Sequence, residues 1–255
     1  MIILINTITA VLLAAVGFLG GLLCCPILNR IPAEWLCDYD EAPDETLLSG
    51  KRYSVKRNGV VLGIALGLST AAIYLINGTS QSQLISLFLC FVLTLIAAAD
   101  AKYQIIPDQF TIAVMFIAID FAIIDCSSTQ MFISKWYQPL IGAAVGGGIL
   151  MALDIFSMLV LKKEGFGFGD IKLMAALGIM FGAKYIIVLL IAASLIAAVH
   201  FLILIFKGNG RIEEGKYLPM APYLCMGAAV TVMFVSWLNN LFILYAAVLE
   251  MKTLP

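Results

Sequence analysis

The sequence predicts an all-α polytopic membrane protein. Of the 255 residues, 62% are hydrophobic and only 12% are charged, whereas a soluble domain carries about 25% charged residues. The hydrophobic residues form long runs, and a membrane-spanning helix needs about 20 mostly apolar residues. The net charge of −1 argues against a nucleic acid as partner, because nucleic-acid-binding surfaces are strongly basic.

About eight apolar runs of the required kind follow one another along the chain. The sixth run is short, and only Gly182-Ala183-Lys184 separates it from the seventh, so we expect these two to form a kinked pair or a re-entrant hairpin. The first run lacks a basic start and is long enough to span, which argues against a cleavable signal peptide. The runs are residues 2–28, 59–77, 83–99, 109–126, 138–161, 171–183, 185–206 and 221–248.

The distribution of lysine and arginine predicts the orientation. If residues 29–58 face the cytoplasm, the loops at 100–108, 162–170 and 207–220 face it too. Together with the adjoining helix ends, that side then holds all of the 15 basic residues except Lys135, Lys184 and Lys252. Since loops rich in lysine and arginine stay in the cytoplasm, we expect this side to be cytoplasmic.

Two aspartates lie at this predicted cytoplasmic boundary, on different helices. Asp100 ends the third run, and Asp170 follows the glycine-rich stretch 165–169 and opens the sixth. An acid at such a place is costly unless it has a function or a partner. In an aspartyl protease, one carboxyl accepts a proton from the attacking water while the other donates one to the substrate carbonyl. We therefore interpret Asp100 and Asp170 as a catalytic pair.

The neighbouring residues suggest supporting roles. Gly167 and Gly169 would let the backbone of Asp170 approach Asp100, while Lys172 would either tune the acid or extend to the lipid headgroups. Asp170 begins a helix, where the dipole favours an anion, and Asp100 ends one, where it favours the protonated form. On this basis we expect Asp170 to be the base and Asp100 the acid of the catalytic pair.

Other interpretations compete with the catalytic pair. Gly-x-Gly-Asp alone is a weak motif, and Asp100, Asp108 and Asp170 would also suit helices that simply end at the water line. Asp154 lies eight residues before Lys162, about 12 Å into the membrane on a helix. A transporter or channel would use Asp154, Asp100 and Asp170 as a proton or cation pathway, although the inverted repeat typical of transporters is not visible.

The loop at residues 29–58 is the only sizeable polar segment. Its acidic residues would attract a positively charged substrate segment; alternatively, the loop is merely solvated, with its basic end anchored at lipid headgroups. The acidic residues are Glu34, Asp38, Asp40, Glu41, Asp44 and Glu45. The six cysteines form no CxxC pair, and His200 is the only histidine, so we expect no metal site.

Four stretches in this order resemble the type IV prepilin peptidases, which are GxGD membrane aspartyl proteases. The first runs from Gly17 to the Asn29-Arg30-Ile31-Pro32 segment, and the second runs from Asp100 through Pro107-Asp108 to Thr111. The third is the GxGD stretch 165–173, and the fourth is the Pro-x-x-Pro stretch 218–224. The resemblance covers nearly the whole chain, and the second and third stretches are its specific parts.

The resemblance implies an enzyme of the bacterial inner membrane whose active site faces the cytoplasm. Asp100 and Asp170 match the catalytic acids, and Asp108 matches a further acid of the family. The implied substrates are prepilins or pseudopilins, cut after a glycine that lies between a short basic leader and an apolar helix. Members often also N-methylate the new terminus with S-adenosylmethionine. Residues 1–58 would then form a methylase-like helix and loop, and residues 59–255 the peptidase bundle.

The chain departs from the family pattern in its first loop. Many members carry two zinc-binding CxxC pairs there, whereas this loop holds the single cysteine Cys37. Zinc is therefore not expected, and this departure argues against methyl transfer, although the segment from Asn29 to Pro32 remains. A protease of the presenilin type would share GxGD but would pair it with Tyr-Asp on the preceding helix, where this chain has Leu153-Asp154.

Overall fold

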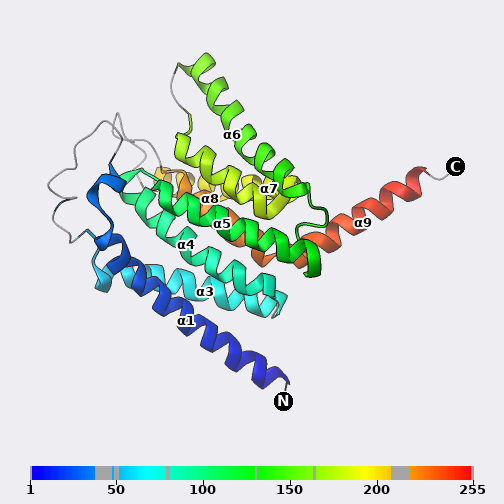
Figure 1. Cartoon of the computed structure of the whole chain (residues 1–255), viewed down its shortest axis with the longest axis horizontal. Helices are drawn as coiled ribbons and strands as arrows, with labels where there is room; N and C mark the ends of the chain where they lie inside the picture. Colours follow the sequence, from blue (N-terminus) through cyan, green and yellow to red (C-terminus); the bar gives the residue numbers. More distant parts are fainter. Residues whose placement is uncertain are drawn as a thin grey trace.

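The computed structural model describes residues 2–37, 48, 52–78, 81–129, 131–162, 165–207 and 219–253. These residues form helices and connecting segments, with no strand among them (Figure 1). The predicted all-α polytopic architecture is therefore confirmed. The α-helices are α1 (Ile2–Arg30), α3 (Val60–Asn77), α4 (Gln81–Tyr103), α5 (Asp108–Ile124), α6 (Gln138–Leu161), α7 (Phe168–Phe206), α8 (Ala221–Met233) and α9 (Val235–Thr253), with short turns η1 (Ala33–Leu36), η2 (Val55–Gly59) and η3 (Asp125–Thr129).

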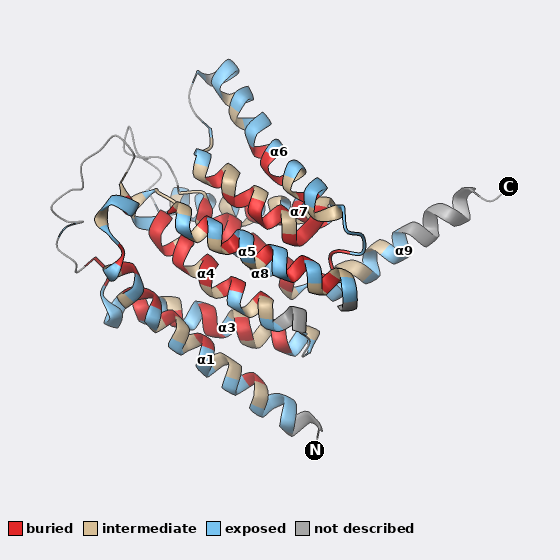
Figure 2. Ribbon diagram, in the orientation of Figure 1, coloured by how far each residue is buried: buried red, intermediate tan, exposed pale blue. Residues whose placement is uncertain are grey.

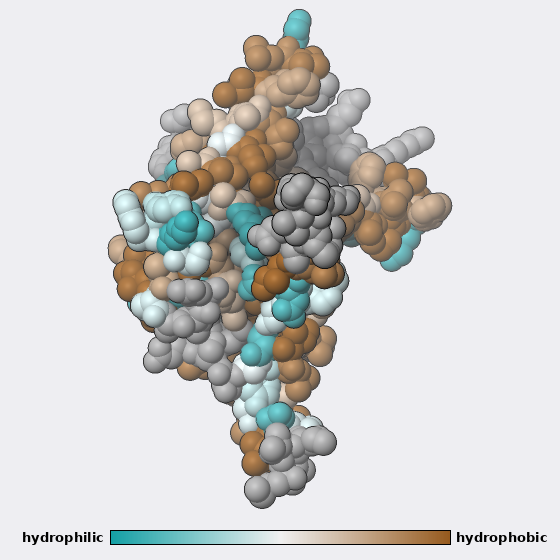
Figure 3. Space-filling model, turned by 90° about the vertical axis from the view of Figure 1, so that its right-hand side faces the viewer, coloured by the Kyte–Doolittle hydropathy of each residue, from teal (hydrophilic) through white to brown (hydrophobic). Residues whose placement is uncertain are grey.

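The interior of the bundle is formed mainly by α4, α5, α7 and α8 (Figure 2). Fully buried side chains such as Ile96, Val114, Leu173 and Leu177 fill the space between them. Helices α1 and α3 pack on one side, and α6 packs along α7 on the other (Figure 1). Many large apolar side chains point outward, for example Leu159, which is 77% exposed. Such an apolar exterior suits lipid. The face drawn in Figure 3, which is the right-hand side of Figure 1, carries both hydrophobic and hydrophilic patches.

Helix α7 folds back on itself at Gly182. A straight helix of 39 residues would be about 58 Å long, nearly twice the roughly 30 Å thickness of a bilayer core. Gly182 has φ 64° and ψ 170°, a backbone conformation that favours glycine. A Cβ placed on Gly146 of α6 would lie 2.5 Å from the oxygen of Met174 and 3.1 Å from Ile186. These two residues would be about 18 Å apart along a straight helix, so the chain reverses between them.

This reversal bears on the number of membrane crossings. In the part of the chain that the structure describes, six helices are long and apolar enough to cross a membrane, or up to seven if the bent pair α8 and α9 is one span. Counting the two halves of α7 separately brings the number back to the predicted value of about eight. The sixth and seventh runs thus form a hairpin, as the separating residues Gly182-Ala183-Lys184 suggested. The last run is bent by 69° between α8 and α9. At that bend the Asn77 side chain donates to the oxygens of Val232 and Met233.

The two ends of the bundle differ in what they carry. The last turns of α1 and α4 and the first turns of α3, α5, α7 and α8 gather at one end, at the left of Figure 1. We call it the aspartate end, because Asp100 and Asp170 both lie there. The opposite end holds η3, the segment 131–137 and the Gly182 turn. The order of the apolar runs predicts the same grouping, because it places the segments at 29–58, 100–108, 162–170 and 207–220 on one side of the membrane.

The packing of α6 on α7 generates a prediction about stability. A Cβ on Gly142 would collide with the oxygen of Gly178 and lie 2.6 Å from the Cα of Gly182, whereas a Cβ on Gly148 meets nothing within 4 Å. Gly142→Ala should therefore lower the free energy of unfolding in detergent by about 1–3 kcal/mol, and Gly148→Ala should change it little. Equal stability of the two variants would show that α6 and α7 do not need this close approach.

Candidate active site

The structure brings Asp100 and Asp170 together. Asp100 lies in the last turn of α4 and Asp170 in the first turn of α7. They are 5% and 9% exposed, and their carboxyl groups are close enough to interact electrostatically. Two buried carboxyls that interact in this way cannot both readily carry a charge at once.

Asp100 also touches a third helix. Its Oδ2 accepts a hydrogen bond of 3.0 Å from the backbone N–H of Ala221, the first residue of α8. Asp100 therefore lies at the C-terminal end of α4 and at the N-terminal end of α8, where unpaired N–H groups favour an anion. The position of Asp100 in α4, which the sequence reveals, does not predict this contact with α8.

Asp170 is held by the turn that opens α7. Its backbone N–H donates to the oxygen of Gly167 at 3.0 Å, and Gly167 itself is extended, with φ −70° and ψ 148°. Among the described residues, the buried Oδ1 of Asp170 has no hydrogen-bond partner. One carboxyl oxygen of the pair is thus left free for a proton or a water molecule.

The two supporting glycines differ in how closely they are packed. A Cβ on Gly169 would lie 3.2 Å from Ile106, in the segment between α4 and α5, which is tighter than ordinary contact. A Cβ on Gly167 would meet only Oδ2 of Asp170, at 3.6 Å. Of the flanking aromatics, Phe166 packs against the core and Phe168 is 69% exposed.

Asp154 holds the glycine-rich loop. Its Oδ1 accepts hydrogen bonds from the backbone N–H groups of Gly165, at 2.9 Å, and Phe166, at 3.1 Å. Residue 165 therefore lies beside residue 154 of α6, 11 positions earlier in the chain. Asp154 thus lies beside the loop that carries Asp170, and its carboxylate satisfies two backbone donors.

Lys172 and Asp108 form an ion pair at the same end. The Nζ of Lys172 lies 2.9 Å from Oδ1 and 3.1 Å from Oδ2 of Asp108, and both side chains are about one-third exposed. The pair joins the first turns of α5 and α7. Because exposed ion pairs contribute only about 0–1 kcal/mol, its effect is to align two helix starts more than to stabilise the fold.

A cluster from the first loop, which the sequence did not predict, packs against the end of α4. The side-chain amide of Asn29 donates to the oxygen of Tyr53 at 2.9 Å and accepts from its N–H at 2.7 Å. The Tyr53 hydroxyl donates to the oxygen of Ala98 at 2.7 Å, and burial raises the pKa of this phenol, which keeps it protonated. Asn29 belongs to a recognised motif, but nothing in the sequence marks Tyr53.

Lys102 completes this cluster. Its Nζ donates to the oxygen of Arg52 at 2.5 Å and lies 4.9 Å from the ring centres of both Tyr53 and Tyr103. The Arg52 guanidinium donates in turn to the oxygen of Ile31 at 2.7 Å. The end of α1 and the segment that precedes η2 and α3 are therefore held to α4 within two residues of Asp100.

Two further polar side chains make contacts of their own. Asp125 is buried at the opposite end and accepts the N–H groups of Met131, Phe132 and Ile133, and His200 pairs with the Tyr223 hydroxyl at 2.6 Å. Within the described residues, no group of three or more His, Cys, Asp or Glu side chains is arranged to hold a metal ion. The acidic residues Asp38, Asp40, Glu41, Asp44 and Glu45 lie outside the described residues.

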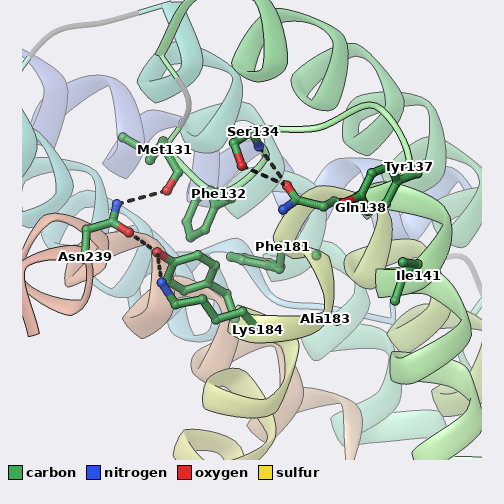
Figure 4. A pocket seen from close by; sticks show the side chains of 12 residues that line it. Met131, Phe132, Ser134, Tyr137, Gln138, Ile141, Phe181, Ala183, Lys184 and Asn239 are labelled. Carbon is green, nitrogen blue, oxygen red and sulfur yellow. Dashed lines mark hydrogen bonds between the residues drawn. The ribbon is translucent and has the colours of Figure 1, made fainter. Parts of the chain in front are cut away.

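A polar cavity of about 390 Å³ lies at the opposite end, beside the Gly182 turn (Figure 4). Lys184 donates to the hydroxyl of Tyr185, which pairs with the side chain of Asn239. Asn239 in turn donates to the oxygen of Met131. Neither Asp100 nor Asp170 lines this cavity, so it is separate from the candidate active site.

Comparison with known proteins points to one family. Residues 87–202, which include both aspartates, match the model of the type IV leader peptidase family. A prepilin leader peptidase/N-methyltransferase of Burkholderia pseudomallei is 27% identical over 209 residues, which are 82% of this chain and 62% of that protein. Proteins of the same name from Escherichia coli and Aeromonas hydrophila are each 28% identical, over 60% and 83% of this chain and 64% and 71% of their own lengths.

These matches confirm the resemblance inferred from the sequence motifs. The chain spans less than two thirds of the length of the Burkholderia pseudomallei relatives. No solved structure matches the chain.

The contact of Asp154 with the loop predicts a local change in dynamics. Asp154→Ala removes the acceptor of two backbone N–H groups, so amide hydrogen exchange at Gly165 and Phe166 should become faster. Asp154→Asn keeps an oxygen acceptor and should restore most of the protection. Asp120→Ala, which removes an exposed acid of α5, is the control and should leave the loop unchanged. Unaltered exchange in Asp154→Ala would contradict the assignment.

The two tyrosines beside Lys102 give a matched prediction. Tyr53→Phe removes the hydrogen bond to Ala98 and should lower the free energy of unfolding by about 0.5–1.5 kcal/mol. The hydroxyl of Tyr103 is buried without a hydrogen-bond partner among the described residues, so Tyr103→Phe should be neutral or stabilising. Chemical denaturation in detergent would compare the two. A larger loss in Tyr103→Phe would mean that the Tyr53 hydroxyl does not hold α4.

Proposed function

We propose that this chain, which carries the type IV leader peptidase pattern over residues 87–202, is a membrane aspartyl endopeptidase. It removes the short basic leader from prepilin or pseudopilin precursors by cutting after a glycine. The observation that carries this proposal is the meeting of Asp100 and Asp170 in one buried site at the ends of two apolar helices. The names of the relatives and the positions of the two aspartates in the matched motifs support it.

We assign the catalytic roles from the hydrogen bonds. Asp100 accepts the N–H of Ala221, which favours its anion, so it is the base that takes a proton from the attacking water. Asp170 also interacts with the backbone of Gly167, but it is desolvated by burial, lies in the field of Asp100, and has one buried oxygen without a partner among the described residues, which suits a protonated carboxyl that donates to the oxygen of the substrate carbonyl. This assignment reverses the one argued from the dipoles of α4 and α7, because α8 also contributes at Asp100.

After water adds to the carbonyl, the two aspartates exchange roles. Asp100, now protonated, donates to the departing amine nitrogen, and Asp170 takes the proton back as the carbonyl re-forms. The shared proton is therefore returned at the end of the cycle. Lys172, Asp108, Gly167 and Gly169 act by positioning the start of α7 and do not take part in the proton transfers.

We propose a bacterial inner membrane as the location, with the aspartate end in the cytoplasm. The support is the excess of lysine and arginine at that end. The acidic residues of the first loop would then attract the cationic leader. Membrane lipid surrounds the apolar exterior.

The second activity in the relatives' names, N-methylation, fits this chain less well. S-adenosylmethionine would supply the methyl group, and residues 1–58 would be the methylase-like part beside the peptidase part at 59–255. However, Asn29 uses both ends of its amide on Tyr53, and Arg52 donates to the oxygens of Leu28 and Ile31. These hydrogen bonds hold the end of α1 and the following residues to the segment before α3.

Nothing in the comparisons supports the alternative of a proton- or cation-coupled transporter that uses Asp154, Asp100 and Asp170. Asp154 contacts the backbone of the glycine-rich loop, which gives it a positioning role in the peptidase. We therefore retain the peptidase as the proposed function.

The test is cleavage of a synthetic precursor by detergent-purified protein. The precursor has a lysine-rich leader, a glycine and an apolar helix, and mass spectrometry reads the products. Asp100→Asn and Asp170→Asn should each lose at least about 100-fold in rate, because each removes a proton-transfer group, while Asp120→Asn should cleave like the wild type. A product heavier by one methyl group after addition of S-adenosylmethionine would establish methylation.

Two results would contradict the proposal. One is folded wild-type protein that cuts none of several precursors. The other is full cleavage by Asp100→Asn or Asp170→Asn, which would mean that these aspartates only end their helices.

A further inference from the structure

A shallow apolar groove of about 210 Å³ lies between α3, α4 and α8. Helix α4 contributes Cys90, Leu93, Thr94 and Ala97 to it. The intervals between these residues are those of a single face of a helix. The next position on the same face is Asp100, three residues beyond Ala97. The groove therefore leads along α4 to a carboxyl of the candidate active site.

The other two helices repeat this arrangement. The contribution of α3 runs from Leu62 to Ser69 and that of α8 from Pro222 to Ala229, with the same intervals of three, one and three residues. On α8 the groove begins beside Ala221, whose N–H binds Asp100. All three faces extend over seven residues, or about 10 Å, away from the aspartate end and into the spanning part of the bundle.

The groove offers almost no free polar group to an occupant. The Ser69 hydroxyl donates to the oxygen of Ala65, and the Thr94 hydroxyl donates to the oxygen of Cys90. Both are satisfied within their own helices. Met226 at the edge is 43% exposed, so the groove opens outward at the depth of the lipid. Its occupant must be apolar and lie within the membrane.

We propose that the groove binds the first two turns of the apolar helix that follows the bond to be cut in the substrate. This proposal rests on the proposed function. Seven residues of a substrate helix rise about 10 Å, which matches the length of the groove. A helix seated there would present the peptide bond just before it to Asp100 and Asp170. The small side chains of Ala65, Ala97 and Ala229 let a helix approach closely.

The first test is photo-crosslinking from two neighbouring positions of α3. Ala65 lines the groove, whereas Leu68 is 66% exposed and is absent from the lining. Benzoylphenylalanine in place of Ala65 should crosslink to the first eight residues of the precursor's apolar helix. The same group in place of Leu68 should crosslink there about tenfold less. Crosslinks from position 65 that reach only lipid or a second copy of this chain would overturn the proposal.

The second test is kinetic and uses the same positions. Ala65→Trp fills the groove and should lower kcat/KM for the precursor by about tenfold, equivalent to 1.4 kcal/mol, with the change mainly in KM. Leu68→Trp should cleave like the wild type. If the wild type cleaves and the two variants match it, the groove proposal fails while the peptidase stands. If the wild type does not cleave, the proposed function fails, and the crosslinks decide the groove separately.

Discussion

The constraint on which the site depends is the placement of two carboxyl groups within electrostatic reach of each other inside an apolar bundle. Asp100 and Asp170 come from different helices and are both buried, and burying a charge without a partner is costly. One N–H of α8 offsets part of this cost at Asp100, while one oxygen of Asp170 stays without a partner among the described residues. The surrounding structure must therefore hold together two groups that would otherwise separate.

Three sets of contacts perform this task, and each fixes a different segment. The cluster of Asn29, Tyr53 and Lys102 fastens the end of α4. Asp154 holds the loop before α7, and the pair of Lys172 and Asp108 aligns the starts of α7 and α5. All of these contacts lie within the aspartate end, which explains why so much of the polar chemistry of an apolar protein is gathered there.

The sequence predicts much of this arrangement, for identifiable reasons. Long apolar runs mark the helices, and the distribution of charge assigns their ends to two sides, so Asp100 and Asp170 are expected at one boundary. The interruption at Gly182 signals a break. The hydrogen bond from Ala221 and the contact of Tyr53 with Ala98 could not be predicted, because they join residues 121 and 45 positions apart. The sequence shows Asp154 as an acid within an apolar run, but not that its carboxylate accepts the N–H groups of Gly165 and Phe166.

The fold-back of α7 also explains how α8 reaches the site. If α7 continued straight beyond Gly182, its last turns would end far from the aspartate end, and the chain would have to cross the membrane again before α8 could start there. The reversal instead returns His200 to the level of Tyr223, in the first turn of α8. The N–H of Ala221, two residues earlier, is thereby brought to Asp100. The positive φ of a single glycine thus helps to place the N–H of Ala221 at Asp100.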